Sequence, residues 1–157
     1  MSIKSQRLLF SVLTMASLGF SSSLYLKVNP AIAIDISQNS EDKSKMIRLY
    51  KEGQAFSRSG KYEDATLKFE QALIVCRSIR DRAYEGIILI NLGVVYRNLE
   101  QYQKAIDYYQ KALVITQEIG SRADEGTILN NLGAIYKNTG EYQKAIEYFQ
   151  RSLIISK

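Results

Sequence analysis

The sequence of 157 residues contains no histidine, no tryptophan, one proline and one cysteine. Histidine is the commonest general base near neutral pH and the commonest metal ligand, so its absence weighs against an enzyme and against a metal site. A single cysteine, Cys76, excludes an intrachain disulfide and a cysteine-cluster zinc site. The sequence also lacks a phosphate-binding glycine loop. We therefore expect a protein that is not an enzyme and that uses no metal or other cofactor.

The formal net charge of +5 is unevenly distributed along the chain. Lys4, Arg7 and Lys27 lie in the first 33 residues, which contain no acidic residue, and the remainder is nearly balanced in charge. A nearly balanced chain without a dense basic stripe is a weak footprint for binding a phosphate backbone. We therefore expect no nucleic-acid partner.

Residues 1–33 have the three parts of a secretory signal peptide. A basic region with Lys4 and Arg7 precedes the uncharged residues 8–26, and residues 30–33 resemble a small-residue cleavage site. The uncharged run also approaches the ~20 residues needed to span a bilayer, so an uncleaved membrane anchor is the alternative. Both interpretations predict that the rest of the chain is exported, to a periplasmic, lumenal or extracellular site. The polar residues 34–40 are a predicted linker, with Ser40 as the N-cap of the first helix.

Residues 41–157 contain a repeat with a period of 40 residues, which predicts three units at about 41–80, 81–120 and 121–157. Each unit carries a glycine, an aromatic residue, an alanine and a second aromatic residue in the same register. The glycines are Gly53, Gly93 and Gly133, and the first aromatic residues are Phe56, Tyr96 and Tyr136. The alanines are Ala65, Ala105 and Ala145, and the second aromatic residues are Phe69, Tyr109 and Phe149.

Apolar residues within each unit follow the spacing of two amphipathic helices, so the sequence predicts an all-α fold. Glycine inside a helix costs about 1 kcal/mol relative to alanine, which suggests that a neighbouring helix packs closely there. We expect Ala105 and Ala145 to face Gly93 and Gly133. On the outward helix faces, we expect the oppositely charged residues Asp107 and Lys111, and Glu147 and Arg151, to pair one helical turn apart.

Short breaks separate the predicted helices. Gly60 and Gly140 lie where the first helix of a unit should end, and Gly120 precedes the third unit; each can adopt the left-handed conformation of a helix C-cap. The second unit has Glu100 in this register, so its cap must be made differently. Ser121 and Asp124 resemble a capping box at the start of the third unit.

These residues resemble the tetratricopeptide repeat, whose pattern is L-G-x-x-Y followed by A-x-x-x-F. The sequence reads Leu92-Gly93-x-x-Tyr96 with Ala105-x-x-x-Tyr109, and Leu132-Gly133-x-x-Tyr136 with Ala145-x-x-x-Phe149. The first unit is looser. The period exceeds the usual ~34 residues, and Arg77, Gln117 and Lys157 replace the closing proline. The Asn-Leu-Gly motif with its 40-residue period is similar to the repeats of kinesin light chains and cell-polarity adaptors. The resemblance implies an α-α superhelix that acts as a scaffold for binding a peptide or a partner protein.

In this family the first helix of each unit lines a concave groove. Carried over by position, the groove candidates are Tyr50, Gln54, Asn91, Arg97, Asn130, Asn131 and Lys137. Asparagine offers a donor and an acceptor to a peptide backbone, and the two cations would favour acidic ligand groups. The alternative is that the asparagines bond to adjacent helices and that the cations are simply solvated.

Two other interpretations remain open. Residues 153–155 are apolar and repeat arrays usually need polar terminal caps, so the third unit should leave an apolar surface open. This surface could meet further repeats or a catalytic domain of a larger exported protein. It could instead mediate self-association, which would make the chain an envelope assembly factor.

Overall fold

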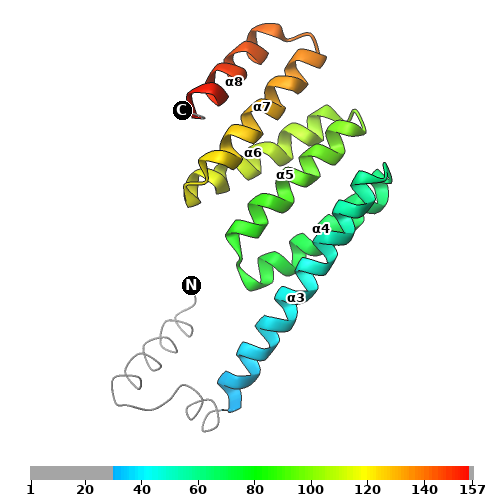
Figure 1. The fold of residues 1–157 in the computed structure, drawn as a ribbon, viewed down its shortest axis with the longest axis vertical. Coiled ribbons are helices and arrows are strands. Elements are labelled where there is room, and N and C mark those ends of the chain that lie inside the picture. Colours follow the sequence, from blue (N-terminus) through cyan, green and yellow to red (C-terminus); the bar gives the residue numbers. More distant parts are fainter. Residues whose placement is uncertain (1–29, 156–157) are drawn as a thin grey trace. The chain divides into compact units, whose positions relative to one another are not determined.

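The structure is a computed structural model that describes residues 30–155, all of whose regular elements are α-helices. They are α3 (Pro30–Arg58), α4 (Tyr62–Ile79), α5 (Arg82–Asn98), α6 (Tyr102–Ile119), α7 (Arg122–Asn138) and α8 (Tyr142–Ile155). The helices form three helix–turn–helix repeats: α3 with α4, α5 with α6, and α7 with α8 (Figure 1). From α4 to α8, each helix packs against the next one along the chain. The predicted all-α fold is therefore confirmed.

Helix α3 begins earlier than the sequence predicts. The chain divides into a unit of residues 1–41 and a unit of residues 42–157, and α3 runs through this boundary. Residues 34–40, the predicted linker, are helical and exposed, and Ser40 lies inside the helix instead of capping it. No glycine or proline interrupts residues 31–52, so nothing local stops the helix from continuing. The predicted signal peptide or anchor lies, up to residue 29, outside the described residues.

The turns that join consecutive helices, both within and between repeats, use the left-handed backbone conformation. Gly60, Gly120 and Gly140 have φ angles of +74°, +71° and +81°, as expected for helix C-caps. Glu100 and Arg80 adopt the same conformation with φ +58°. The second repeat therefore keeps the turn geometry of the others, although a side chain there costs roughly 1–2 kcal/mol that glycine avoids.

The helix-interior glycines make room for aromatic rings. A Cβ atom added to Gly93 would lie 2.6 Å from Cε1 of Tyr109, and one added to Gly53 would lie 2.7 Å from Cδ1 of Phe69. Gly133 has the same relation to Phe149. The prediction that Ala105 and Ala145 face these glycines is wrong. The side chain that meets each glycine is instead the aromatic ring four residues after the alanine, Tyr109 or Phe149. Each ring thus locks the two helices of its repeat together.

A buried carboxylate links the first repeat to the second. Glu85 accepts a hydrogen bond of 2.8 Å from Nε of Arg77 on α4, and one of 2.7 Å from Nη1 of Arg82. Arg82 also pairs with Glu118 at the end of α6. At the next junction, Nε2 of Gln117 donates to Oε1 of Glu125 over 2.8 Å. The two junctions therefore bond through equivalent positions, one period of 40 residues apart. The ion pair of Arg77 with Glu85 at the first junction is replaced at the second by a hydrogen bond between the Gln117 amide and the Glu125 carboxylate.

The expected ion pairs on the outward helix faces do not form. Lys111 lies 5.4 Å from the ring centre of Tyr108, and Arg151 lies 5.5 Å from that of Tyr148. Asp107 instead accepts a hydrogen bond from Gln103. Each of these rings is stacked on another tyrosine, so the cations meet an aromatic surface that the sequence reasoning had not placed beside them.

The predicted capping box is also absent. Oγ of Ser121 donates to Oδ2 of Asp124 over 2.6 Å, and it makes no cap bond to a backbone amide. By contrast, Asp81 caps α5, because its side chain accepts a hydrogen bond of 3.1 Å from the backbone N–H of Tyr84.

Candidate partner-binding face

Six of the seven predicted site residues lie on one surface, which is formed by the first helix of each repeat. Tyr50 and Gln54 come from α3, Asn91 and Arg97 from α5, and Asn131 and Lys137 from α7. We call this surface the first-helix face. Lys137 is exposed and the other five side chains are partly buried, so the face is open to a partner yet well supported.

Hydrogen bonds join the first two helices across this face. Nε2 of Gln54 donates to the Tyr50 hydroxyl over 2.7 Å, and Nδ2 of Asn91 approaches the same oxygen at 3.5 Å. Asn91 also donates to the backbone carbonyl of Ile87 over 2.8 Å. The amide orientation is thereby fixed, with Oδ1 of Asn91 left without a hydrogen-bond donor in the described part of the chain.

A second link joins α5 to α7. The Arg97 guanidinium donates to Oδ1 of Asn131, and Nδ2 of Asn131 donates to the carbonyl of Thr127 over 2.9 Å. Among residues 34–155, neither Arg97 nor Lys137 has a carboxylate partner. The face therefore holds two cations whose charge no acidic side chain neutralises.

Asn130 differs from the other predicted site residues. It lines a hollow of about 540 Å³ together with Arg122, Thr127, Ser152 and other residues of α7 and α8. It takes no part in the hydrogen-bonded row of the first-helix face. Asn130 shares its register with Tyr50, which lies on the first-helix face, and with the buried Ile90.

Three further residues of the face were missed by the sequence reasoning. The rings of Tyr84 and Tyr50 meet edge to face with centres 6.1 Å apart. Burial raises the pKa of Tyr50, and the nearby charges of Tyr84 and Asp124 raise it further. Lys51 is the residue of the first repeat that corresponds to Asn91 and Asn131 in the second and third repeats. Lys51 could have been found by extending the register of Asn91 to the first repeat, whereas Tyr84 and Asp124 share a register that contains none of the predicted groove residues.

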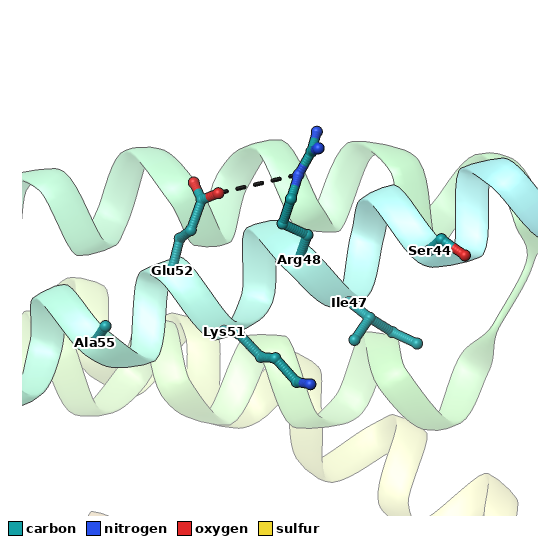
Figure 2. A pocket seen from close by; sticks show the side chains of 6 residues that line it. All are labelled: Ser44, Ile47, Arg48, Lys51, Glu52 and Ala55. Atoms are coloured by element: carbon teal, nitrogen blue, oxygen red, sulfur yellow. Dashed lines mark ion pairs between the residues drawn. The ribbon is translucent and has the colours of Figure 1, made fainter.

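The outer side of α3 carries a second, shallower hollow of about 580 Å³. Figure 2 shows Arg48 and Glu52 projecting from one side of the helix while Ile47 and Lys51 lie on the other. Oε1 of Glu52 lies 4.0 Å from Nε of Arg48, and Oε2 lies 2.7 Å from Nζ of Lys68 on α4. This charged network marks the N-terminal end of the array.

In the range 34–155, no group of three or more His, Cys, Asp or Glu residues could hold a metal ion. Cys76 is buried, its thiol lies 3.0 Å from the carbonyl oxygen of Asp81, and burial raises its pKa to about 12. Among the described helices, none combines the length and apolar character required to cross a bilayer.

Comparisons with known proteins identify the repeat. The sequence model of the tetratricopeptide repeat matches residues 84–157. The TPR domain of Arabidopsis FLU superposes with a TM-score of 0.66 at 22% identity, covering 72% of this chain and 95% of that one. The N-terminal domain of C. elegans stress-induced protein-1 gives 0.63 at 16% identity, covering 73% and 86%.

A third solved structure, BtubC from P. vanneervenii, gives a TM-score of 0.68 at 26% identity over 80% of this chain. The chain spans 53% of the length of BtubC. No curated protein sequence matches the chain. The structural likenesses establish the shared fold.

Proposed function

We propose that this chain, a tetratricopeptide-repeat protein, binds an extended, acidic segment of a partner protein on its first-helix face. Repeat arrays of this fold generally act as protein-binding scaffolds, and the specific ligand is inferred from the residues of this face. The observation that carries the proposal is the row of hydrogen bonds that crosses α3, α5 and α7.

The row supports binding because it orders polar groups before a ligand arrives. Side chains that are already fixed lose less conformational entropy on binding, which raises affinity. Oδ1 of Asn91 is free to accept from a peptide N–H, and the second N–H of the Asn131 amide is free to donate to a peptide carbonyl. These groups suit the backbone of an extended peptide, which offers both partners at every residue.

Charge favours an acidic ligand. At the junction of the first and second repeats, Arg77 and Arg82 are neutralised by the carboxylates of Glu85 and Glu118. Arg97 donates only to the amide oxygens of Asn131 and Asn98, and Lys137 has no ion pair among the described residues. Asp124 is the acidic residue near this face that opposes such a ligand. A partner that supplies carboxylates would therefore gain charge-assisted hydrogen bonds.

A cross-linked pull-down from an envelope fraction tests the proposal. The unmodified chain is compared with a variant that carries Asn91→Ala, Arg97→Ala, Asn131→Ala and Lys137→Ala. A matched control removes the same groups, two amides and two cations, from the exposed surface of α6: Gln103→Ala, Lys104→Ala, Gln110→Ala and Lys111→Ala. Circular dichroism verifies that both variants are helical.

The expected result is a partner captured by the unmodified chain and by the α6 control but not by the face variant. Capture should also weaken as salt rises, because exposed charges are screened. Equal capture by all three proteins would refute the proposed face. Capture lost from both variants would show that general surface charge, and not the first-helix face, holds the partner.

We further propose that binding takes place outside the cytoplasm. The support is the sequence of residues 1–33, with its basic start, its uncharged run and its small-residue site. Cell fractionation with a C-terminal tag checks this, and a tag found in the cytoplasmic fraction would contradict it.

A further inference from the structure

The charges of the first-helix face change sign along the helices. Residues 40 positions apart occupy equivalent places on α3, α5 and α7, and we call three such sets the first, second and third levels of the face. The first level consists of Ser44, Tyr84 and Asp124, the second of Lys51, Asn91 and Asn131, and the third of Ser57, Arg97 and Lys137. The charge at the first level is therefore negative, whereas the charges at the other two are all positive.

The negative charge at the first level is not neutralised within the chain. Oδ2 of Asp124 accepts a hydrogen bond of 2.6 Å from the Ser121 hydroxyl, and Asp124 forms no ion pair among residues 34–155. By contrast, Asp81 just before α5 is paired with Nζ of Lys43 over 3.2 Å. A carboxylate has two oxygens and can accept several hydrogen bonds. Asp124 therefore has acceptor capacity left for a cationic group of a ligand.

Two tyrosine rings lie near this carboxylate. Tyr84 on α5 is the equivalent of Asp124 on α7, and its ring meets that of Tyr50 edge to face, with centres 6.1 Å apart and an angle of 79°. Burial raises the pKa of the Tyr50 hydroxyl, and Asp124 is close enough for its charge to raise that pKa further. An edge-to-face contact leaves at least one face of each ring free of the other, and the faces of tyrosine rings attract cations. The first level thus combines a carboxylate with aromatic rings, a setting that suits an ammonium or guanidinium group.

The positive levels lie at a definite distance from Asp124. Asn131, whose Oδ1 accepts from the guanidinium of Arg97, comes seven residues after Asp124 on α7. At 1.5 Å per residue this is about 10 Å along the helix. An extended peptide advances about 3.3 Å per residue, so about three residues are the shortest connection between the two places.

We propose that the segment bound on the first-helix face is bipolar: it carries a lysine or arginine that lies against Tyr84 and Asp124, and its acidic side chains begin about three residues away. This inference rests on the proposed function, because the acidic side chains are those that Arg97 and Lys137 bind. It adds a role for Asp124, which would repel a uniformly acidic ligand. It also fixes the direction of the segment, because the reversed segment would bring like charges together.

Fluorescence anisotropy of the full chain in a mild detergent tests the proposal with short, labelled peptides of glycine and serine. All carry two adjacent glutamates. The first has no other charge, the second has a lysine three residues before the glutamates, and the third has a lysine three residues after them. One of the two lysine peptides should bind roughly 5–30-fold more tightly than the first, the gain expected for a cation held by an aromatic ring and a carboxylate.

Variants of Asp124 separate ligand binding from a structural role. Asp124→Asn should abolish the gain from lysine without weakening the binding of the first peptide. Asp124→Lys should reverse the preference, so that a fourth peptide with glutamate at the favoured lysine position binds more tightly than the lysine peptide. The matched controls are Asp64→Asn and Asp64→Lys, because Asp64 is also the third residue of its helix, α4, and is exposed away from the first-helix face. Both controls should keep the full gain from lysine.

The outcomes distinguish this inference from the proposed function. Binding of the first peptide that requires Arg97 and Lys137, with no gain from lysine at either position, would overturn the bipolar ligand alone. A gain from lysine that survives Asp124→Asn, or that is lost equally in Asp64→Asn, would do the same. A chain that binds none of the peptides, or that binds them equally well after Arg97→Ala with Lys137→Ala, would overturn the proposed function together with this inference.

Discussion

Replacing Gly93 with alanine adds one methyl group, and the structure shows what that group would meet. Its carbon would lie 2.6, 2.7 and 2.8 Å from three ring atoms of Tyr109. Carbon atoms in favourable contact are about 3.5 Å or more apart, so the overlap is close to 1 Å over one edge of the ring. Because Tyr109 is fully buried, the ring has no free space into which it could move.

The magnitude follows from two opposing effects. Alanine gains about 1 kcal/mol over glycine inside a helix. Forcing an extra methyl group into a packed core costs typically 1–3 kcal/mol, because helices and side chains must shift. We expect Gly93→Ala to lower the free energy of unfolding by about 1–2 kcal/mol, measured by urea denaturation followed by circular dichroism.

Gly133→Ala is the matched comparison. The added methyl group meets Phe149 at 2.8 Å, which is nearly the same overlap. Phe149 is only partly buried, so its ring has space into which it can move. The helix propensity gain should then offset most of the overlap, leaving a change near zero. If Gly93→Ala proved as stable as the unmodified chain, or if the two variants behaved alike, the packing argument would be refuted.

Three further predictions concern buried polar groups. The Tyr109 hydroxyl is buried without a hydrogen-bond partner among the described residues, so Tyr109→Phe should leave stability unchanged or raise it by up to about 1–3 kcal/mol in urea denaturation, and a clear loss would contradict this. Burial alone raises the pKa of Glu85, but hydrogen bonds and charges from Arg77 and Arg82 outweigh it and lower the pKa below its usual range. The ionised form therefore stabilises the folded chain above pH ~5, and this contribution is lost as the pH falls below ~4; Glu85→Gln should flatten that dependence, and an unchanged pH profile would count against it. Cys76, whose pKa burial raises to about 12, should react with a thiol reagent only at the rate of unfolding, and rapid labelling of the folded chain would show that the thiol is accessible.

The helices themselves could be predicted because the spacing of apolar residues defines one buried side of each helix. The same register also placed Asn91, Arg97 and Asn131 on one surface. It could not place contacts between repeats, since these depend on how one repeat is rotated against the next. The bond from Arg97 to Asn131 spans 34 residues rather than the period of 40, so no comparison of equivalent positions would have suggested it.

Other differences arise where local sequence leaves more than one outcome open. Glu100 adopts a left-handed conformation that is unfavourable for a side chain, because the packing of α5 against α6 fixes the turn around it. Residues 34–40 are polar enough for a linker, yet they contain no residue that ends a helix, so α3 continues through them. Neither the left-handed conformation of Glu100 nor the continuation of α3 through residues 34–40 can be predicted from the spacing of apolar residues alone.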